Sequence, residues 1–559
     1  MKTTCRKFFA ILLCLAVFAS VATTAFAAEK NYFFDEPDAE PRKEYSKPVK
    51  ALMNASDDVI FALVKGINAT IPTPKSWPKK ADYASEGLLR GQSDFLSAAA
   101  DGAVWSLGYA RASILEGQDV KDGKHYVAGS LDVHKKTVTE IYDDLFVRTA
   151  AISDGSGRGV AVFAVIDGYG MSSTDVRAIR KEMESYCKEK NIVSLNIGVL
   201  HQHSAVDTFG MNGPIGPALF NGMRNLFGQA PVNGQNKTYM RNLYNKTEET
   251  IKSAVESMQE GRLYYSTVDA SHYVYDKRTP YVLDRDINLL RFVPTDRTAA
   301  ETWMTTYSAH CVGNGAAQCE ITGDYPYYME KELMQKAGVN FMMILGAEQG
   351  TSQNKEKGEG EDGVEDGTVG NYDDSKRIYG VRAMGLTLAR LLIRKGAENA
   401  VEVSPLLNIA HREVYFTIQN PILTFAGKMG LFINQVVRSG FNRYEVVSEI
   451  GYMEMGDDLA FAIIPGELAA ELAYGGCLGE GESWRNEAWT KPSMQETTGE
   501  RQLLILGIMN DQVGYIIPSN DYMPIVNEDN KSLELVSLGD EAAPILVDAY
   551  AQLIADVRK

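Results

Sequence analysis

The sequence contains little of several residues and patterns that define common protein classes. Only seven histidines occur in 559 residues, and no two cysteines are spaced Cys-x-x-Cys, which argues against a zinc site built on cysteine pairs. No Gly-x-Ser-x-Gly elbow occurs, so a serine-hydrolase mechanism is disfavoured. The 56 basic residues are outnumbered by 73 acidic ones, and such an acidic surface disfavours nucleic acid as a partner. Beyond residue 28 no run reaches about 18 apolar residues, so we expect no transmembrane segment in the mature chain.

The first 28 residues have the composition of a secretory signal peptide. A start with three basic charges is followed by an apolar stretch from Phe8 to about Val21 and then by small residues. This order predicts cleavage near Ala27 or Ala28 and a secreted, extracellular or periplasmic protein. Removing the three basic charges of this segment takes the formal net charge from −17 to −20.

Four cysteines remain in the mature chain: Cys187, Cys311, Cys319 and Cys477. Export permits disulfides, and Cys311 and Cys319 are close enough in sequence to close a small loop. We therefore hypothesise a Cys311–Cys319 disulfide.

After the signal peptide we expect an N-terminal extension over residues 29–95 and one large domain over residues 96–559. The extension contains one amphipathic helix candidate at 49–67. A closing helix is predicted over 542–557, where apolar residues recur at helical spacing.

One low-complexity stretch, residues 355–374, is rich in Gly, Asp and Glu. Its carboxylates offer ligands for Ca²⁺ or Mg²⁺, but their spacing does not match an EF-hand. A mobile, solvated acidic loop is therefore the favoured interpretation.

The middle of the chain alternates strand and helix patterns. Residues 146–152 and 160–167 are apolar and flank a Gly-rich turn, which predicts a β-hairpin. A helix over 172–188 and an apolar strand over 192–200 complete a βαβ unit, in which functional residues gather at the carboxyl ends of the strands. The predicted fold class is α/β: one large catalytic domain with mixed β-sheets flanked by helices, built from βαβ and hairpin units.

The motif His201-Gln202-His203-Ser204 follows the last of these strands. Alternate residues of a strand point to the same face, so two imidazoles reach one place, as a hydrolytic zinc centre requires. Asp167 ends the neighbouring strand at the same edge. The alternative is that two polar residues simply end a buried strand.

Three further patterns follow in order along the chain: His310 with Thr322-Gly323-Asp324, Pro465-Gly466-Glu467 after an apolar strand, and Gly507-Ile508-Met509-Asn510 leading to Tyr515. With the His-x-His-Ser motif they resemble the neutral/alkaline ceramidases, zinc amidohydrolases that cleave the N-acyl bond of ceramide. The resemblance covers roughly residues 105–522. It implies a ceramidase-like zinc hydrolase domain acting on a lipid or other acyl-amide substrate.

The resemblance also implies roles for particular residues. One catalytic Zn²⁺ would be held by His201, His310, Glu467 and Tyr515, a set of nitrogen and oxygen donors that zinc accepts. A water on the zinc would attack the acyl carbonyl, and His203 beside it would donate a proton to the leaving amine or stabilise the oxyanion. The competing interpretations are a solvated turn for Glu467 and a half-buried core aromatic for Tyr515.

Two catalytic residues are implied on weaker matches. The family motif Gly-Asp-x-Ser-Pro-Asn aligns with residues 346–354, where Ser352 is kept but the Asp and Pro are absent. Glu348 is a candidate to replace the missing carboxylate, while an ordinary loop serine is the alternative for Ser352. Arg278, in Asp276-Lys277-Arg278, resembles an arginine of the family that faces the substrate, and a surface arginine is the alternative.

The chain departs from the family in two further ways. Only 44 residues follow Tyr515, so we expect no C-terminal immunoglobulin-like domain, and the His-x-His motif continues as Ala205-Val206-Asp207 in place of Gly-Pro-Gly. The leading hypothesis is a secreted zinc amidohydrolase releasing a fatty acid and a free amine (sphingosine) from ceramide or a similar acylated amine, with peripheral membrane contact. The alternatives are hydrolysis of another acyl amide or ester, and a non-catalytic secreted binding protein. The oligomeric state stays open.

Overall fold

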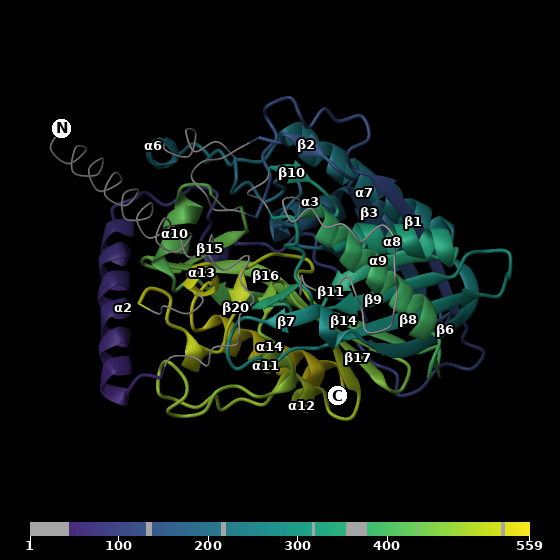
Figure 1. The fold of residues 1–559 in the computed structure, drawn as a ribbon. Coiled ribbons are helices and arrows are strands. Elements are labelled where there is room, and N and C mark those ends of the chain that lie inside the picture. Colours follow the sequence, from purple (N-terminus) through teal and green to yellow (C-terminus); the bar gives the residue numbers. More distant parts are fainter. Residues whose placement is uncertain are drawn as a thin grey trace.

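The computed structural model describes residues 44–129, 137–213, 220–315, 319–353, 377–431, 433–526 and 531–558. The expected signal peptide and the acidic loop at 355–374 lie outside these residues. Two large β-sheets organise the described part, and helices cover their outer faces (Figure 1). No helix within the described ranges combines the length and hydrophobicity that crossing a bilayer requires.

The larger sheet has nine strands in the order β11-β9-β8-β6-β1-β3-β4-β5, with β13 paired to β6. Its β4–β5 and β9–β11 pairs are parallel and its other pairs are antiparallel, so the sheet is mixed. The strands are β1 Trp105–Ser113, β3 Phe146–Ser153, β4 Val160–Ile166, β5 Ile192–Val199, β6 Gln259–Asp269, β8 Asp286–Pro294, β9 Thr302–Tyr307, β11 Asn340–Leu345 and β13 Val401–Val403.

The second sheet has five strands in the order β14-β16-β17-β19, with β15 paired to β16. These are β14 Leu407–Thr417, β15 Val436–Gly440, β16 Arg443–Met455, β17 Leu459–Ile463 and β19 Gln502–Leu506. Three two-stranded ladders connect loops: β2 Glu140–Ile141 with β10 Glu320–Ile321, β7 Val274–Asp276 with β12 Thr351–Gln353, and β18 Glu467–Leu468 with β20 Tyr515–Ile516.

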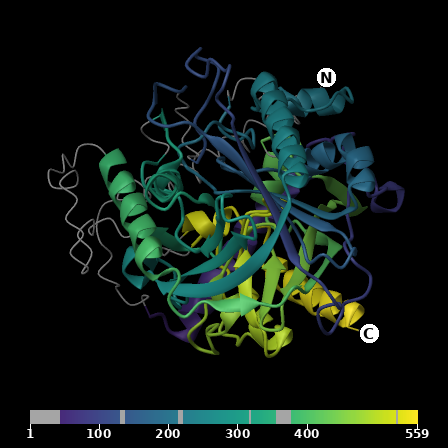
Figure 2. The same ribbon diagram turned by 90° about the vertical axis from the view of Figure 1, so that its right-hand side faces the viewer.

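The two sheets pack on each other because the strands of the second sheet are apolar on both faces. Along β17, Leu459, Phe461 and Ile463 belong to the core shared with the larger sheet. The alternate residues Ala460 and Ala462 belong to a second core, which α14 closes. This alternation follows from the two-residue repeat of a strand, and it yields helix, sheet, sheet and helix layers, seen from the side in Figure 2.

Helices α7, α8 and α9 pack against strands of the larger sheet, and α14 packs on β14 and β16 of the smaller one. Helix α2 lies at one edge of the molecule against α10 (Figure 1). The α-helices named here are α2 Lys47–Asn68, α3 Ser173–Glu182, α4 Glu184–Glu189, α6 Asn221–Leu226, α7 Lys237–Glu256, α8 Asp324–Lys336, α9 Ile378–Lys395, α10 Pro421–Lys428, α11 Ala470–Tyr474, α12 Met494–Thr498, α13 Lys531–Leu535 and α14 Ala542–Val557.

Several sequence predictions are confirmed. Strands β3 and β4 form the expected antiparallel hairpin, and β5 lies parallel to β4, which completes the βαβ unit. The mixed α/β architecture and the helices near residues 49–67 and 542–557 are present as expected. The single helix expected over 172–188 is instead two helices, α3 and α4, because the helical backbone breaks at Met183.

The hypothesised Cys311–Cys319 disulfide is wrong, because no disulfide joins these two cysteines. Different neighbours hold the two backbones. The Cys311 carbonyl accepts from the backbone N–H of His203 at 3.1 Å, whereas the Cys319 carbonyl accepts from that of Thr139 at 2.8 Å.

A buried histidine links the two sheets. His411 of β14 has Nε2 at 2.7 Å from the Ser194 hydroxyl of β5, and that hydroxyl accepts from the Asn196 amide at 2.9 Å. This side-chain contact joins β14 of the smaller sheet to β5 of the larger one. Burial lowers the pKa of His411 to about 4.

We predict that this histidine makes the protein less stable in acid. Below pH ~6.5 the unfolded chain protonates His411 while the folded chain does not until about pH 4, so stability is lost over that window, by about 3 kcal/mol in total. Urea unfolding at several pH values should show a shallower loss in His411→Gln. Identical pH slopes for the two proteins would contradict the prediction.

Candidate metal centre

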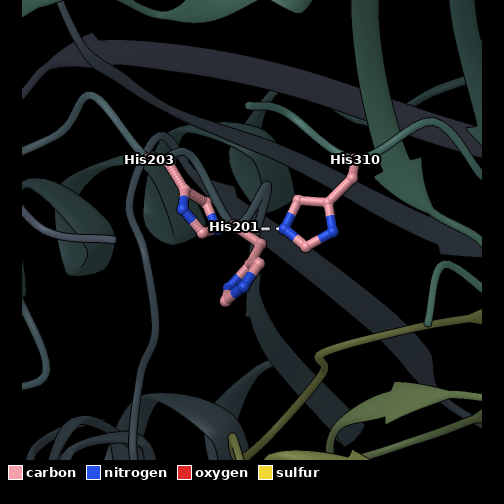
Figure 3. Close-up of side chains that lie close together, drawn as sticks. All are labelled: His201, His203 and His310. Carbon is pink, nitrogen blue, oxygen red and sulfur yellow. Dashed lines mark hydrogen bonds between the residues drawn. The ribbon is translucent and has the colours of Figure 1, made fainter. Parts of the chain in front are cut away.

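Three histidines converge at the carboxyl ends of β5 and β9. The centroids of the His201, His203 and His310 rings lie 4.8 to 5.0 Å from one another (Figure 3). One ligand atom from each comes within 4.8 Å of the others. Strand β5 ends at Val199, so the two motif histidines do not lie on one face of a strand as predicted. They meet because His201 adopts a left-handed backbone conformation (φ 49°) and turns the chain.

Backbone carbonyls orient two of these rings. Nδ1 of His201 lies 2.6 Å from the carbonyl of Tyr169, and Nδ1 of His203 lies 2.9 Å from that of Gly129. Since carbonyls only accept, each Nδ1 carries the proton and each Nε2 offers a lone pair. Nε2 of His203 then faces Nε2 of His310 at 3.0 Å. This convergence of ring nitrogens is the donor arrangement that a metal ion requires.

Two buried carboxylates complete the cluster. Glu467 begins β18 and has Oε1 at 3.5 Å from Nε2 of His201 and 2.9 Å from the Gln512 amide, which donates to it. Glu348 lies 3.1 Å from Nδ1 of His310, but without hydrogen-bond alignment. Over the described residues both Glu348 oxygens and Oε2 of Glu467 lack a hydrogen-bond partner. Burying a carboxylate without a partner costs free energy, and a bound cation would offset that cost for these oxygens.

Burial shapes the protonation of the cluster. Desolvation raises the pKa of Glu348 well above its usual range, and neighbouring Glu467 adds to this effect. Desolvation lowers the pKa of His203 and of His310 well below the usual range, reinforced by His201. Neutral imidazoles are the form in which histidine binds metals, so the histidines are already in the binding state.

Tyr515 is placed beside Glu467 by the short parallel ladder of β18 and β20, where the two residues are register partners. Burial raises the pKa of Tyr515 well above its usual range, with Glu467 as the second cause. The structure therefore brings all four residues of the implied zinc set, and His203, to one region. The solvated-turn alternative for Glu467 does not apply, because it is 3% exposed.

Hydrogen bonds and ion pairs fix the turn that carries the two motif histidines. The Gln202 amide donates to Asp167 at 3.1 Å and to the Gly323 carbonyl at 2.6 Å. Asp167 is in turn paired with the buried guanidinium of Arg148 at 2.8 Å, and Arg148 also pairs with Glu330 of α8 at 2.7 Å. This network fixes the turn to the larger sheet and to α8.

Ser352 is buried in the short strand β12. In β12 its register partner is Tyr275 of β7. The next residue, Gln353, points to the opposite face of the strand, where its amide donates to the His310 carbonyl at 3.2 Å. The side chain that supports His310 from this strand is therefore Gln353.

Arg278 belongs to a separate buried cluster. Its guanidinium pairs with Asp521 at 2.8 Å, Glu471 at 3.2 Å and Glu534 at 3.5 Å. It is 4% exposed, which excludes the surface alternative, and its donors are directed at these carboxylates. The structure does not bring Arg278 to the histidines, whereas the neighbouring Lys277 interacts electrostatically with His310 and Glu348.

Sequence reasoning missed three neighbours of the centre: Tyr169, Lys277 and Gln512. Tyr169 stacks on His201 with ring centroids 4.4 Å apart. It follows Asp167 at the carboxyl end of a strand, so the rule that located Asp167 also pointed to it. Gln512 lies two residues beyond Asn510 of a recognised motif, and that proximity was its only signal.

Fold and centre together define a mixed α/β protein with a buried cluster of histidines and carboxylates suited to a metal ion. Among solved structures the chain is similar to neutral ceramidase from Pseudomonas aeruginosa, with 14% identity over 82% of this chain and 74% of that chain and a TM-score of 0.56. It is equally similar to a ceramidase complexed with C2, with 14% identity, coverage of 82% and 75%, and a TM-score of 0.57.

These likenesses confirm that the chain has the ceramidase fold expected from the motifs. No protein-family model matches the sequence. No curated protein matches it.

We predict that Arg278 supports stability. Arg278→Met should lower the free energy of unfolding by about 3–5 kcal/mol, because three buried carboxylates lose their counter-charge. Chemical denaturation measures this loss, and Arg438→Met, which removes an exposed arginine, is the matched control. Wild-type stability of Arg278→Met would contradict the structural role.

Proposed function

We propose that the protein is a zinc-dependent amidohydrolase that cleaves the N-acyl bond of ceramide or a similar acylated amine. The observation that carries the proposal is the meeting of His201, His310, Glu467 and Tyr515, which come from four distant segments, at one buried place. That they meet within the fold of a neutral ceramidase supports the same proposal. Secretion, expected from the leader, is part of the proposed function.

The residues present suit zinc. His201, His310, Glu467 and Tyr515 would hold the ion, and neutral imidazole, carboxylate and phenolate are all zinc donors. The two carboxylates at the centre carry the charge that one divalent cation neutralises, and the orphaned oxygens of Glu348 and Glu467 gain a partner. When bound, zinc supplies a Lewis acid that polarises the acyl carbonyl and makes water acidic at neutral pH.

His203 is the residue placed to move the proton. Its Nδ1 is held by the Gly129 carbonyl, so Nε2 carries the free lone pair toward the centre. The low pKa that burial imposes keeps this nitrogen unprotonated before the reaction. Nε2 would accept the proton that water loses on attack and pass it to the nitrogen of the leaving amine, so that acid and amine leave with protons balanced.

Neither Ser352 nor Arg278 is needed for this sequence of steps. Ser352 pairs in register with Tyr275, and Arg278 is held by Asp521 and Glu471. Lys277, which follows β7 directly and interacts electrostatically with Glu348, would offset negative charge that develops on the carbonyl oxygen.

The first test couples metal content to hydrolysis. The purified protein should hold about one zinc per chain and release fatty acid from a fluorescent short-chain ceramide. Chelation should abolish this release and zinc should restore it. His201→Ala should lose both zinc and at least about 100-fold in kcat/KM. His411→Gln, which alters a histidine at the sheet interface, should keep both at neutral pH.

The outcomes separate the hypotheses. Zinc binding without ceramide hydrolysis would contradict the substrate and direct attention to other acyl amides and esters. A chain that binds no zinc would refute the metal mechanism and favour a binding protein.

A second prediction concerns Glu348. Glu348→Gln keeps the size of the side chain but removes a carboxyl group that a cation bound beside His310 would ionise, so zinc affinity should fall about 10- to 100-fold. Competition with a chromophoric chelator measures this affinity without relying on activity. Glu454→Gln, which makes the same change in a buried glutamate of β16 that pairs with Arg558, should leave it unchanged. Equal zinc affinities for Glu348→Gln and wild type would show that Glu348 does not contribute to metal binding.

A further inference from the structure

One face of the molecule is built around α10, which packs on both α2 and α6. The Lys428 ammonium at the end of α10 donates to the carbonyl of Asn68, the last residue of α2, and to that of Ile71, three residues further on. The amides of Asn225 and Asn221 in α6 donate to the carbonyls that end α10, at 2.6 Å each. Figure 1 shows α2, α10 and α6 on the same side of the molecule. We call this region the α10 face.

The α10 face exposes large apolar side chains. On α2 they recur along one stripe, where Val49, Leu52, Val59 and Leu63 are 42 to 69% exposed. On α6 and its flanks the corresponding residues are Phe220, Met223, Leu226 and Phe227. Single exposed apolar residues are normal on a protein surface. Here two helices that both pack on α10 expose several such residues each, which indicates an interaction surface.

The charge of the same region is opposite to that of the chain. Residues 59–81, 208–228 and 420–444 carry eight Lys and Arg and no Asp or Glu, in a protein of net charge −17. Of these eight, Lys428 is buried and Lys80 pairs with Glu445. These segments supply the end of α2, all of α6 and all of α10. They also adjoin in space, because the N–H of Arg438 donates to the Pro78 carbonyl at 2.8 Å.

We propose that the α10 face docks on a phospholipid surface with anionic head groups. Apolar residues from helices that lie flat enter the boundary of the acyl chains, and nearby Lys and Arg attract the phosphates. The acidic remainder of the protein is repelled by the same membrane, so charge also sets the orientation. Apolar insertion and electrostatic attraction together bind a membrane more strongly than either does alone.

The chain connects this face to the metal centre. Segment 208–228 begins five residues after His203, and the loop between is held by Asp207, whose carboxylate accepts from the backbone N–H groups of Phe209 and Gly210 at 2.9 and 2.8 Å. The α10 face and the histidine turn are therefore neighbours along the chain. The docking proposal goes beyond the proposed activity and does not require it.

Flotation of the mature protein with vesicles tests the proposal. Vesicles of phosphatidylcholine and phosphatidylglycerol at roughly 2:1, without ceramide, should carry the protein upward, and added salt should weaken binding. The double variant Leu52→Asp/Leu63→Asp should bind at least about tenfold more weakly. Val401→Asp, which charges a 59% exposed valine on β13, is the matched control and should bind as wild type does.

Three outcomes would overturn the proposal: no vesicle binding by the wild type, equal binding by the double variant, or equal loss in the Val401→Asp control. Light scattering tests a fourth outcome. If the wild type does not bind vesicles but forms a dimer, and Leu63→Asp dissociates that dimer, the face binds a second copy of the chain instead. Circular dichroism checks that the variants fold. Hydrolysis of a soluble short-chain substrate without vesicles is read separately, so failure of docking and failure of the activity are distinguishable.

Discussion

The centre depends on one buried ion pair network. The Arg148 guanidinium, 2% exposed, joins Asp167 at the end of β4 to Glu330 in α8, and Asp167 in turn holds Gln202 between the two motif histidines. A buried guanidinium is costly unless its partners are well placed, so each partner is fixed by the requirement to neutralise it. The histidine turn therefore has its position set by the sheet below it, before any metal is considered.

The parts predicted from sequence were those encoded by local pattern. The hairpin of β3 and β4 and the closing helix α14 follow from apolar spacing alone, and the ligand motifs stood out because histidine is scarce. The break at Met183 was missed, since apolar residues continue at helical spacing on both sides of it. The mechanism proposed for bringing His201 and His203 together was wrong, because a left-handed backbone at His201 is not visible in strand periodicity.

The sequence predicted least well the positions of side chains whose neighbours come from distant segments of the chain. Arg278 meets Glu471 and Asp521, which lie 193 and 243 positions further along the chain. On either side of Ser352, Thr351 and Gln353 donate to the backbone carbonyls of Ser308 and His310, contacts that the motif position of Ser352 did not indicate. The sequence offered Glu348 as a candidate to replace the missing carboxylate, but only the structure shows that it lies 3.1 Å from His310 and is fully buried.

The candidate ligands divide between the two sheets: His201 and His310 follow strands of the larger sheet, whereas Glu467 and Tyr515 follow strands β17 and β19 of the smaller one. An ion held by all four would therefore act as a cross-link between layers. Because the unfolded chain does not assemble these ligands, every tenfold rise in free metal above the dissociation constant adds about 1.4 kcal/mol to the stability of the folded state. The lifetime of the folded protein would then follow the metal supply of its surroundings.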